Sequence, residues 1–230
     1  MVEAKTEFSW PPLESDPEIF NNYLWKLGLP NSFHLGEIFS LDEELIPTVP
    51  KSVGIIANIQ KGKNEFTYSE EKKLKYSDVD FFMKQAGTLD NACGVIAALH
   101  VIGNNISACH LQKDSILEKF FTASVGKDEN ERCALLEGMN DFKSEHQVYS
   151  NQGQSKLCEK QEDVCGHFIA FVLHKNRLFE LNGSLGNPYL IDENVQPDDF
   201  IKRTFAVIQD RLSNGYISDN LAMMYFAETN

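Results

Sequence analysis

The sequence predicts a mixed α/β protein in which helices pack beside an antiparallel β-hairpin. Three observations carry this prediction. Residues 93–103 are apolar on every face, which is typical of a buried helix. Two strong strand patterns meet at Lys175–Asn176, as in a hairpin. Residues 16–29 place apolar side chains at helical spacing behind an Asp16 cap and Pro17.

The remaining elements follow in order along the chain. "SLDEELIPTVP" predicts a short helix stopped by Pro47, and residues 51–60 predict a buried strand. Two helices are expected at 115–125 and 129–142. Residues 144–166 are polar without a clear period and form a long connection, which is usually functional or disordered. A helix at 198–212 and a strand at 221–228 complete the pattern.

Composition limits the classes of function. The chain has 230 residues, enough for one large domain with a full core. Hydrophobic residues make up 42% and charged residues 24%, which argues against wholesale disorder. A formal charge of −13 disfavours nucleic acid and anionic membranes as partners, because both would be repelled. A basic partner would be attracted.

Cysteine usage and the N-terminus indicate a reducing compartment. The five cysteines are an odd number, no CxxC occurs, and "MVEAKTEFSWPPLE" lacks the apolar run of a secretory signal. No stretch reaches the length of a membrane span. We therefore expect a monomer with free thiols in the cytoplasm, or also in the nucleus.

Cys93 stands at the start of the buried helix, directly after "LDNA". Helix N-terminal amides favour a thiolate, the nucleophilic form, although a small core residue is the simpler interpretation of this helix alone. The hairpin adds a partner for the thiol. A two-residue turn at Lys175–Asn176 places Asn182 opposite Ile169, with His167 on the same face two positions along. An imidazole oriented by a neighbouring amide is the base half of a cysteine-hydrolase site.

These residues carry a resemblance to a family. "MKQ…NACGVIAALHVIGNN", "GHFIAFV" and "LFELNG" resemble the catalytic motifs of the ubiquitin C-terminal hydrolases, and "WPPLESDPEIFNNYLWKLGL" resembles that family's N-terminus. The resemblance spans the whole chain as one catalytic domain, 1–230. It implies a papain-like cysteine peptidase fold, with a central antiparallel sheet flanked by helices, a knotted backbone and an active-site crossover loop at roughly 150–163.

The resemblance also implies roles for individual residues and a substrate. Cys93 would be the nucleophile, His167 the base and Asn182 its orienting residue, while Gln85 would donate to the oxyanion. Small adducts or short peptides would be removed from the C-terminal glycine of ubiquitin or a ubiquitin-like protein, without a cofactor or metal. Residues implied to bind ubiquitin are Pro12, Leu13, Glu14 and Glu37.

Two departures from the family pattern bear on catalysis. The orienting position is usually Asp, whereas here it is Asn182, followed by "GSLGNP" in place of the usual "GR". An amide can orient an imidazole but cannot stabilise the imidazolium by charge. The interval from Gln85 to Cys93 is also two residues longer than in the family, with Gly87 available to let the extra residues loop outward.

Other interpretations were weighed. Cys158, Cys165 and His167 could suggest zinc, but their spacing lacks the paired ligands of a structural site. His100 is expected to be a core histidine, and His146 an exposed one in the polar connection. A protein that binds and holds free ubiquitin with little turnover is the alternative function, and Asn182 with the altered spacing supports it.

Overall fold

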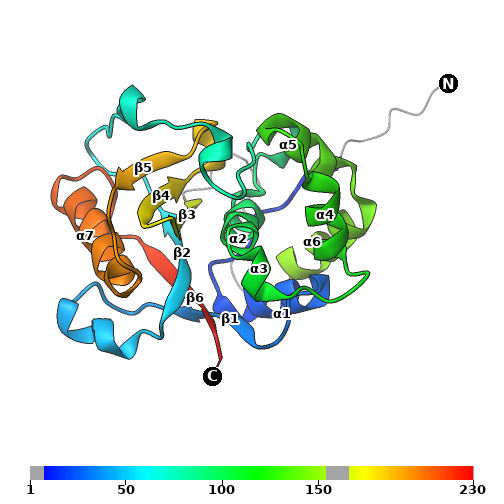
Figure 1. The fold of residues 1–230 in the computed structure, drawn as a ribbon, viewed down its shortest axis with the longest axis horizontal. Helices are drawn as coiled ribbons and strands as arrows, with labels where there is room; N and C mark the ends of the chain where they lie inside the picture. Colours follow the sequence, from blue (N-terminus) through cyan, green and yellow to red (C-terminus); the bar gives the residue numbers. More distant parts are fainter. Residues whose placement is uncertain (1–7, 154–165, 230) are drawn as a thin grey trace.

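A six-stranded antiparallel sheet forms the centre of the molecule in the computed structural model, which describes residues 8–153 and 166–229 (Figure 1). Its strand order is β1-β6-β2-β3-β4-β5, and every neighbouring pair is antiparallel. The strands are β1 (Phe33–Glu37), β2 (Ser52–Ile59), β3 (His167–His174), β4 (Arg177–Leu181), β5 (Tyr189–Asp192) and β6 (Ala222–Glu228). The predicted antiparallel sheet with flanking helices is confirmed.

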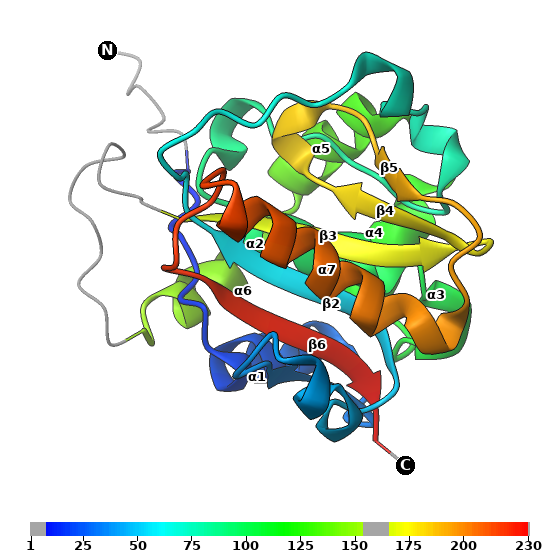
Figure 2. The ribbon, with the colours of Figure 1, turned by 90° about the vertical axis from the view of Figure 1, so that its left-hand side faces the viewer.

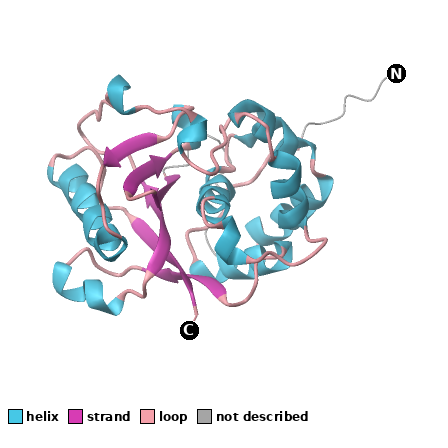
Figure 3. Ribbon diagram, viewed as in Figure 1, coloured by secondary structure: helices cyan, strands magenta, loops and turns pink. Residues whose placement is uncertain are grey.

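Helices cover both faces of the sheet, and the strands alternate between two cores. On β2, Ile56 enters one core while Ile55 and Ala57 enter the other, as the two-residue period of a strand requires. Figures 1 and 3 show α7 on one side, with the short 3₁₀ helix at Glu43–Thr48 beside it, and the other α-helices grouped on the opposite side. Those helices are α1 (Pro17–Leu27), α2 (Cys93–Gly103), α3 (Ile106–Cys109), α4 (Ile116–Ser124), α5 (Glu129–Gly138) and α6 (Asn140–Ser150); α7 spans Phe200–Ser213.

Helix α2 is the centre of the larger core, as its sequence predicted. All eleven of its residues are buried, and it packs against β3 and β2. Ala92 precedes the helix and makes no side-chain capping bond, so the backbone amides of the first turn are not satisfied by a cap. The helix therefore presents polar N–H groups at its Cys93 end and, apart from His100, an apolar surface along its length.

The hairpin has the predicted turn and register. Lys175 and Asn176 have φ values of 50° and 58°, the left-handed pair that a tight two-residue turn requires. Ala170 pairs with Leu181, which is the register that the sequence predicted. Figure 2 shows β3 and β4 side by side in the sheet, with α7 crossing in front of the sheet. This register fixes which side chains at the start of β3 face those that follow β4.

Three sequence predictions of local structure were wrong. The helix at 43–48 is a 3₁₀ helix that contains Pro47 instead of stopping before it. The single helix expected at 129–142 is divided into α5 and α6, because Met139 takes an extended conformation between them. The polar connection begins later than expected, since α6 continues to Ser150. Strands β1 and β5, of five and four residues, were not predicted.

Most of the predicted crossover segment, from 154 onward, lies outside the described residues, so this segment and the knotted backbone stay predictions. Among the described residues, no helix combines the length and apolar character needed to cross a membrane.

Candidate functional site

Cys93 is the first residue of α2, and its side chain is almost enclosed, at 6% exposure. The next residue explains the close packing at this helix end. A Cβ on Gly94 would lie 3.1 Å from Phe20 Cζ and 3.4 Å from both Leu13 Cβ and Phe168 Cδ2. These neighbours hold the first turn of α2 in place, so the sulfur has a fixed position on a rigid helix.

His167 begins β3 and lies between Cys93 and Asn182. Its Nε2 is 2.8 Å from Asn182 Oδ1 and 3.0 Å from Ser184 Oγ. The ring also makes a hydrogen bond with the Cys93 side chain. The structure thus brings together three of the predicted site residues, from the start of α2, the start of β3 and the residue after β4.

The hydrogen bonds of Asn182 determine which ring nitrogen of His167 carries a proton. The backbone N–H of Ser184 donates to Asn182 Oδ1 over 3.0 Å, so this atom is the carbonyl oxygen of the amide. An oxygen acceptor requires Nε2 to be the donor in its 2.8 Å bond. The lone pair of the neutral ring therefore lies on Nδ1, the nitrogen left to accept a proton from the thiol.

The surroundings of His167 favour its charged form. Burial is the largest single influence and lowers its pKa. The hydrogen bond and charge of Cys93, the bond to Asn182 and the charge of Glu180 act in the opposite direction. Their combined effect is stronger, and the pKa of His167 is raised above its usual 6.5. A raised histidine pKa next to a thiol favours a thiolate–imidazolium pair.

Glu180 belongs to a buried polar network behind His167. The carboxylate is fully buried and forms an ion pair with Arg211 from α7. Tyr68 donates a 2.6 Å hydrogen bond to its other oxygen, and burial, with the charge of Glu180, raises the pKa of that phenol. Because both oxygens of Glu180 have partners, this buried charge is compensated while still acting on His167 at longer range.

Gln85 is held by two bonds near the start of α2. Its backbone N–H donates to the Gly183 carbonyl over 3.0 Å, and its Nε2 donates to the Asp90 carbonyl over 2.7 Å. A side-chain amide has two N–H groups, so one remains for a ligand. Gly183 permits this arrangement, since a Cβ there would lie 2.9 Å from Gln85 Cβ. Because Gly183 has no side chain, the Gln85 segment can pack closely against the loop that carries Asn182.

The two extra residues between Gln85 and Cys93 turn toward α5. Gly87 has a φ of 63°, the conformation that the looped insertion was expected to need. Glu137 of α5 accepts hydrogen bonds from the backbone and hydroxyl of Thr88, at 2.6 and 2.7 Å. The insertion is therefore anchored on α5.

The residues predicted to bind ubiquitin lie at the same end of the molecule. Leu13 is buried against the first turn of α2, and Pro12 and Glu14 beside it are half-buried. Glu37 ends β1 and is exposed. Strand pairing aligns it with Ala170, three residues past the start of β3, and three strand spacings, about 14 Å, separate the two strands.

Two other histidines occupy core positions. His100 is fully buried, bonds Met83 at 3.1 Å, and burial lowers its pKa to about 4, as expected for a core histidine. The prediction for His146 was wrong. It lies on α6, is fully buried, and bonds the Pro11 carbonyl at 2.7 Å. Burial lowers its pKa to about 4 as well.

The described residues contain no group of three or more His, Cys, Asp or Glu side chains placed to hold a metal ion. Cys158 and Cys165, the other members of the zinc alternative, lie outside those residues.

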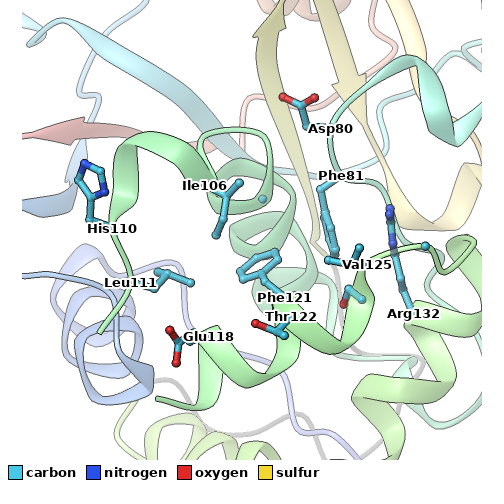
Figure 4. A pocket seen from close by; sticks show the side chains of 13 residues that line it. Asp80, Phe81, Ile106, His110, Leu111, Glu118, Phe121, Thr122, Val125 and Arg132 are labelled. Carbon is cyan, nitrogen blue, oxygen red and sulfur yellow. The ribbon is translucent and has the colours of Figure 1, made fainter. Parts of the chain in front are cut away.

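Two cavities lie on different parts of the surface. The larger, about 670 Å³, is bordered by α3 and α4 and lined by Phe81, Ile106 and Phe121, with Arg132 and Glu118 at its margins (Figure 4). It contains none of the predicted site residues. The smaller, about 260 Å³, is lined by His167. Size alone would therefore identify the wrong region as the reactive one.

Ser184 and the buried network of Tyr68, Glu180 and Arg211 were not predicted from the sequence. A signal existed for Glu180, because a carboxylate within the apolar strand "RLFEL" has to find a buried partner. No sequence pattern indicated that Arg211 would be that partner, since it lies on a distant helix. Ser184 was noted only as a departure from the family's arginine.

Comparisons with known proteins agree with one another. A family model described as ubiquitin carboxyl-terminal hydrolase, family 1, matches residues 10–213. Ubiquitin carboxyl-terminal hydrolase 3 of Arabidopsis thaliana is 35% identical over 193 residues, 81% of this chain and 80% of the relative. A probable ubiquitin carboxyl-terminal hydrolase of Dictyostelium discoideum is 28% identical over 214 residues, 89% and 82% of the two chains.

A solved structure shows the same fold. The catalytic domain of Trichinella spiralis UCH37, bound to ubiquitin vinyl methyl ester, matches with a TM-score of 0.73 at 19% identity. The match covers 99% of this chain and 100% of that domain.

Proposed function

The chain belongs to ubiquitin carboxyl-terminal hydrolase family 1, whose members are cysteine-type deubiquitinating hydrolases, and from that premise we propose that it releases small adducts or short peptides from the C-terminal glycine of ubiquitin through an acyl-enzyme at Cys93. The observation that supports the assignment best is the chain of contacts from Cys93 through His167 to Asn182. The ubiquitin adduct in the related Trichinella structure supports the choice of substrate.

In the proposed reaction, His167 Nδ1 takes the thiol proton and the Cys93 sulfur attacks the carbonyl carbon of the terminal glycine. The tetrahedral intermediate collapses when the protonated imidazole gives its proton to the leaving amine, and a thioester remains on Cys93. Water then attacks the thioester with His167 as the base. Release of the glycine carboxylate restores the thiol and completes the cycle.

Gln85 and the Cys93 backbone N–H are proposed to stabilise the oxyanion of that intermediate. The amide of Gln85 keeps one N–H for this purpose, because the other is bonded to Asp90. Its bond to Asp90 fixes the amide before substrate arrives, and a fixed donor needs no reorganisation during the reaction. Loss of such a donor typically reduces the rate by about 10²–10³-fold.

Asn182 and Ser184 are proposed to position His167 together. Asn182 accepts from Nε2 and thereby keeps the proton-accepting lone pair on Nδ1. The Ser184 hydroxyl lies 3.0 Å from the same nitrogen and offers a second oxygen to Nε2–H. Two neutral acceptors, with the more distant charge of Glu180, support the imidazolium where the family usually has one carboxylate.

Ubiquitin is proposed to bind at the end of the sheet where β3 begins. Glu14 and Glu37 lie at this end, and the chain as a whole carries a charge of −13, which favours a basic segment of substrate. Phe39 follows Glu37 and is 87% exposed, as a contact residue for a protein partner would be. Pro12 and Leu13 are proposed to shape the adjoining wall.

Residues 1–230 are proposed to form one catalytic domain that acts as a monomer in the cytoplasm or nucleus, without a cofactor. Pairing of β1 with β6 supports the single domain, because it joins distant parts of the chain in one sheet.

The alternative is a ubiquitin-binding protein with little turnover, and the amide at Asn182 is the feature that favours it. A ubiquitin C-terminal fluorogenic amide separates the two when hydrolysed by wild type, Cys93→Ala and Asn182→Asp. We expect turnover by wild type, none by Cys93→Ala, and a higher rate for Asn182→Asp. Tight ubiquitin binding without wild-type turnover would support the alternative. Parallel rates on ubiquitin-like fusions test the preference among modifiers.

A further inference from the structure

A cavity of about 260 Å³ adjoins His167 on the side of the sheet that α7 covers. Its walls come from the end of β2 and the segment after it, and from the end of α7 and the turn after it: Ile59, Phe66, Tyr68, Arg211 and Tyr216. We propose that this cavity is a leaving-group subsite, which receives an aromatic or large apolar side chain on the first residue after the scissile bond. The proposal rests on the proposed function and adds a preference for one class of leaving group.

The position of the cavity relative to His167 supports this role. Among the described residues, the cavity lining includes His167 but not Cys93, Gln85 or Asn182. Cys93 belongs to the core on the α2 side of the sheet, whereas Ile59 packs against the core on the α7 side. His167 therefore stands between the thiol and the cavity. In acyl transfer the general acid lies beside the departing amine, so a group leaving past His167 meets this cavity.

The walls of the cavity are aromatic and fit a flat apolar side chain. Phe66 packs edge-on against Tyr68 at 4.8 Å and against Tyr216 at 5.2 Å between ring centroids. The Arg211 guanidinium lies 4.6 Å from the Phe66 ring centre. Its charge is neutralised by Glu180, and the Tyr68 hydroxyl is also bonded to Glu180. These two polar groups are thus already paired, whereas Lys61, Asn64 and Glu65, which also line the cavity, are exposed to solvent. The rings remain for a partner that packs with them.

Backbone pairing holds the two walls together before any ligand binds. Gly62 N–H donates to the Tyr216 carbonyl over 3.0 Å, and Asn64 N–H donates to the Gly215 carbonyl over 2.9 Å. Lys61 and Ile217 form an antiparallel bridge. A preformed site loses less conformational entropy when a ligand binds. Sites for drug-sized ligands are about 300–1,000 Å³, so the smaller volume of this cavity suits a single side chain.

The test uses ubiquitin extended by a short peptide whose first residue is Phe, Leu, Glu or Gly. We expect wild type to cleave the Phe fusion with kcat/KM about tenfold above that of the Gly fusion, as aromatic packing of this kind allows. Tyr216→Ala and Phe66→Ala should reduce this ratio toward one. Tyr216→Phe, which keeps the ring, should retain the ratio and serves as the matched control.

Equal rates for the Phe and Gly fusions in wild type would overturn the proposal, as would a preference that survives both alanine variants. Labelling of Cys93 by ubiquitin vinyl methyl ester keeps this result separate from the proposed function, because that probe places no amino acid in the cavity. Labelling without a preference contradicts the subsite alone, whereas absence of labelling and of cleavage contradicts the hydrolase. Thermal unfolding of each variant shows that it is folded.

Discussion

The two sides of the candidate site are built by different kinds of interaction. On the helix side, Cys93 is held by packing, because every residue of α2 is buried and the first turn is closed in by neighbouring apolar side chains. On the hairpin side, His167 is held by hydrogen bonds to Asn182 and Ser184. Packing fixes a position without influencing charge, while hydrogen bonds fix an orientation and a protonation state.

The histidines show the same contrast. His100 on α2 is buried without a charged partner that would favour its protonation, and its pKa falls to about 4. His167 is half-buried, and its polar neighbours raise its pKa although burial acts to lower it. Burial alone thus makes a histidine neutral, and polar neighbours are needed to make it a proton carrier. We therefore expect changes on the helix side to alter stability and changes on the hairpin side to alter rate.

The largest effect is expected from His167→Ala. Loss of the base should reduce kcat by about 10⁴-fold or more, while the free energy of unfolding should change by less than about 1 kcal/mol, since the side chain lies at the start of a strand. Turnover of the fluorogenic ubiquitin amide and urea unfolding measure the two quantities. A loss of stability as large as that of a core substitution would remove the distinction between the two sides.

Leu99→Ala on α2 is expected to show the opposite pattern. Leu99 is fully buried, and truncation of such a side chain typically lowers the free energy of unfolding by about 2–5 kcal/mol. The kcat per folded molecule should change by less than about threefold, because α2 keeps its contacts at the Cys93 end. Urea unfolding and active-site titration with the ubiquitin electrophile give both numbers. A tenfold fall in kcat per titrated site would show that packing along α2 also tunes the thiol.

Acid should destabilise the fold through two buried histidines on the helix side. His100 and His146 have pKa values of about 4 in the folded state, below their unfolded value of about 6.5. The unfolded chain then binds more protons between these values, so stability falls as pH drops from about 6.5 to 4, by about 3 kcal/mol for each histidine at the lower limit. Urea unfolding at pH 7 and pH 5 checks the direction. His146→Gln should reduce the dependence on pH, and an unchanged slope in this variant would contradict the assignment.

Ser184→Ala is expected to give the smallest effect. It tests whether the Ser184 hydroxyl contributes to the protonation state of His167. Removal of the hydroxyl should lower kcat/KM by about three- to tenfold, as loss of one ordinary hydrogen bond does, because Asn182 still accepts from the same N–H of His167. Because that bond favours the imidazolium, the pKa of His167 should fall, and the alkaline limb of the pH profile should move to lower pH. Ser184→Thr, which keeps the hydroxyl, is the control. A lower rate without a moved limb would indicate a structural role for the serine.

Local patterns predicted the parts of the site that depend on neighbouring residues. Helix α2 and the hairpin register followed from apolar periodicity and a two-residue turn, which made Cys93, His167 and Asn182 candidates. Their catalytic roles came from the family resemblance. The partnership of Glu180 with Arg211 could not, because it joins β4 to α7 across the sheet. His146 was misjudged because α6 has a mostly polar sequence, and its burial depends on contacts with Pro11 and Tyr23.

The short strands were missed for a related reason. Strands β1 and β5 form the two edges of the sheet, and few residues make too weak a pattern to recognise alone. Their identity depends on which strand they pair with, and that information lies elsewhere in the chain.

The place of β6 has a consequence for the time course of folding. This strand lies between β1 and β2, and it pairs Glu228 with Phe33 and Ala227 with Ser52. Contacts between residues so distant in sequence form slowly, so β1 cannot join the sheet until the far part of the chain has arrived. Helix α1 packs on β1, and Phe20 of α1 covers the first turn of α2, so until β1 is in place we expect the Cys93 sulfur to be more accessible to oxidants and alkylating agents. During refolding, Cys93 should therefore be modified readily by oxidants and alkylating agents. Its modification should slow once β6 has joined the sheet.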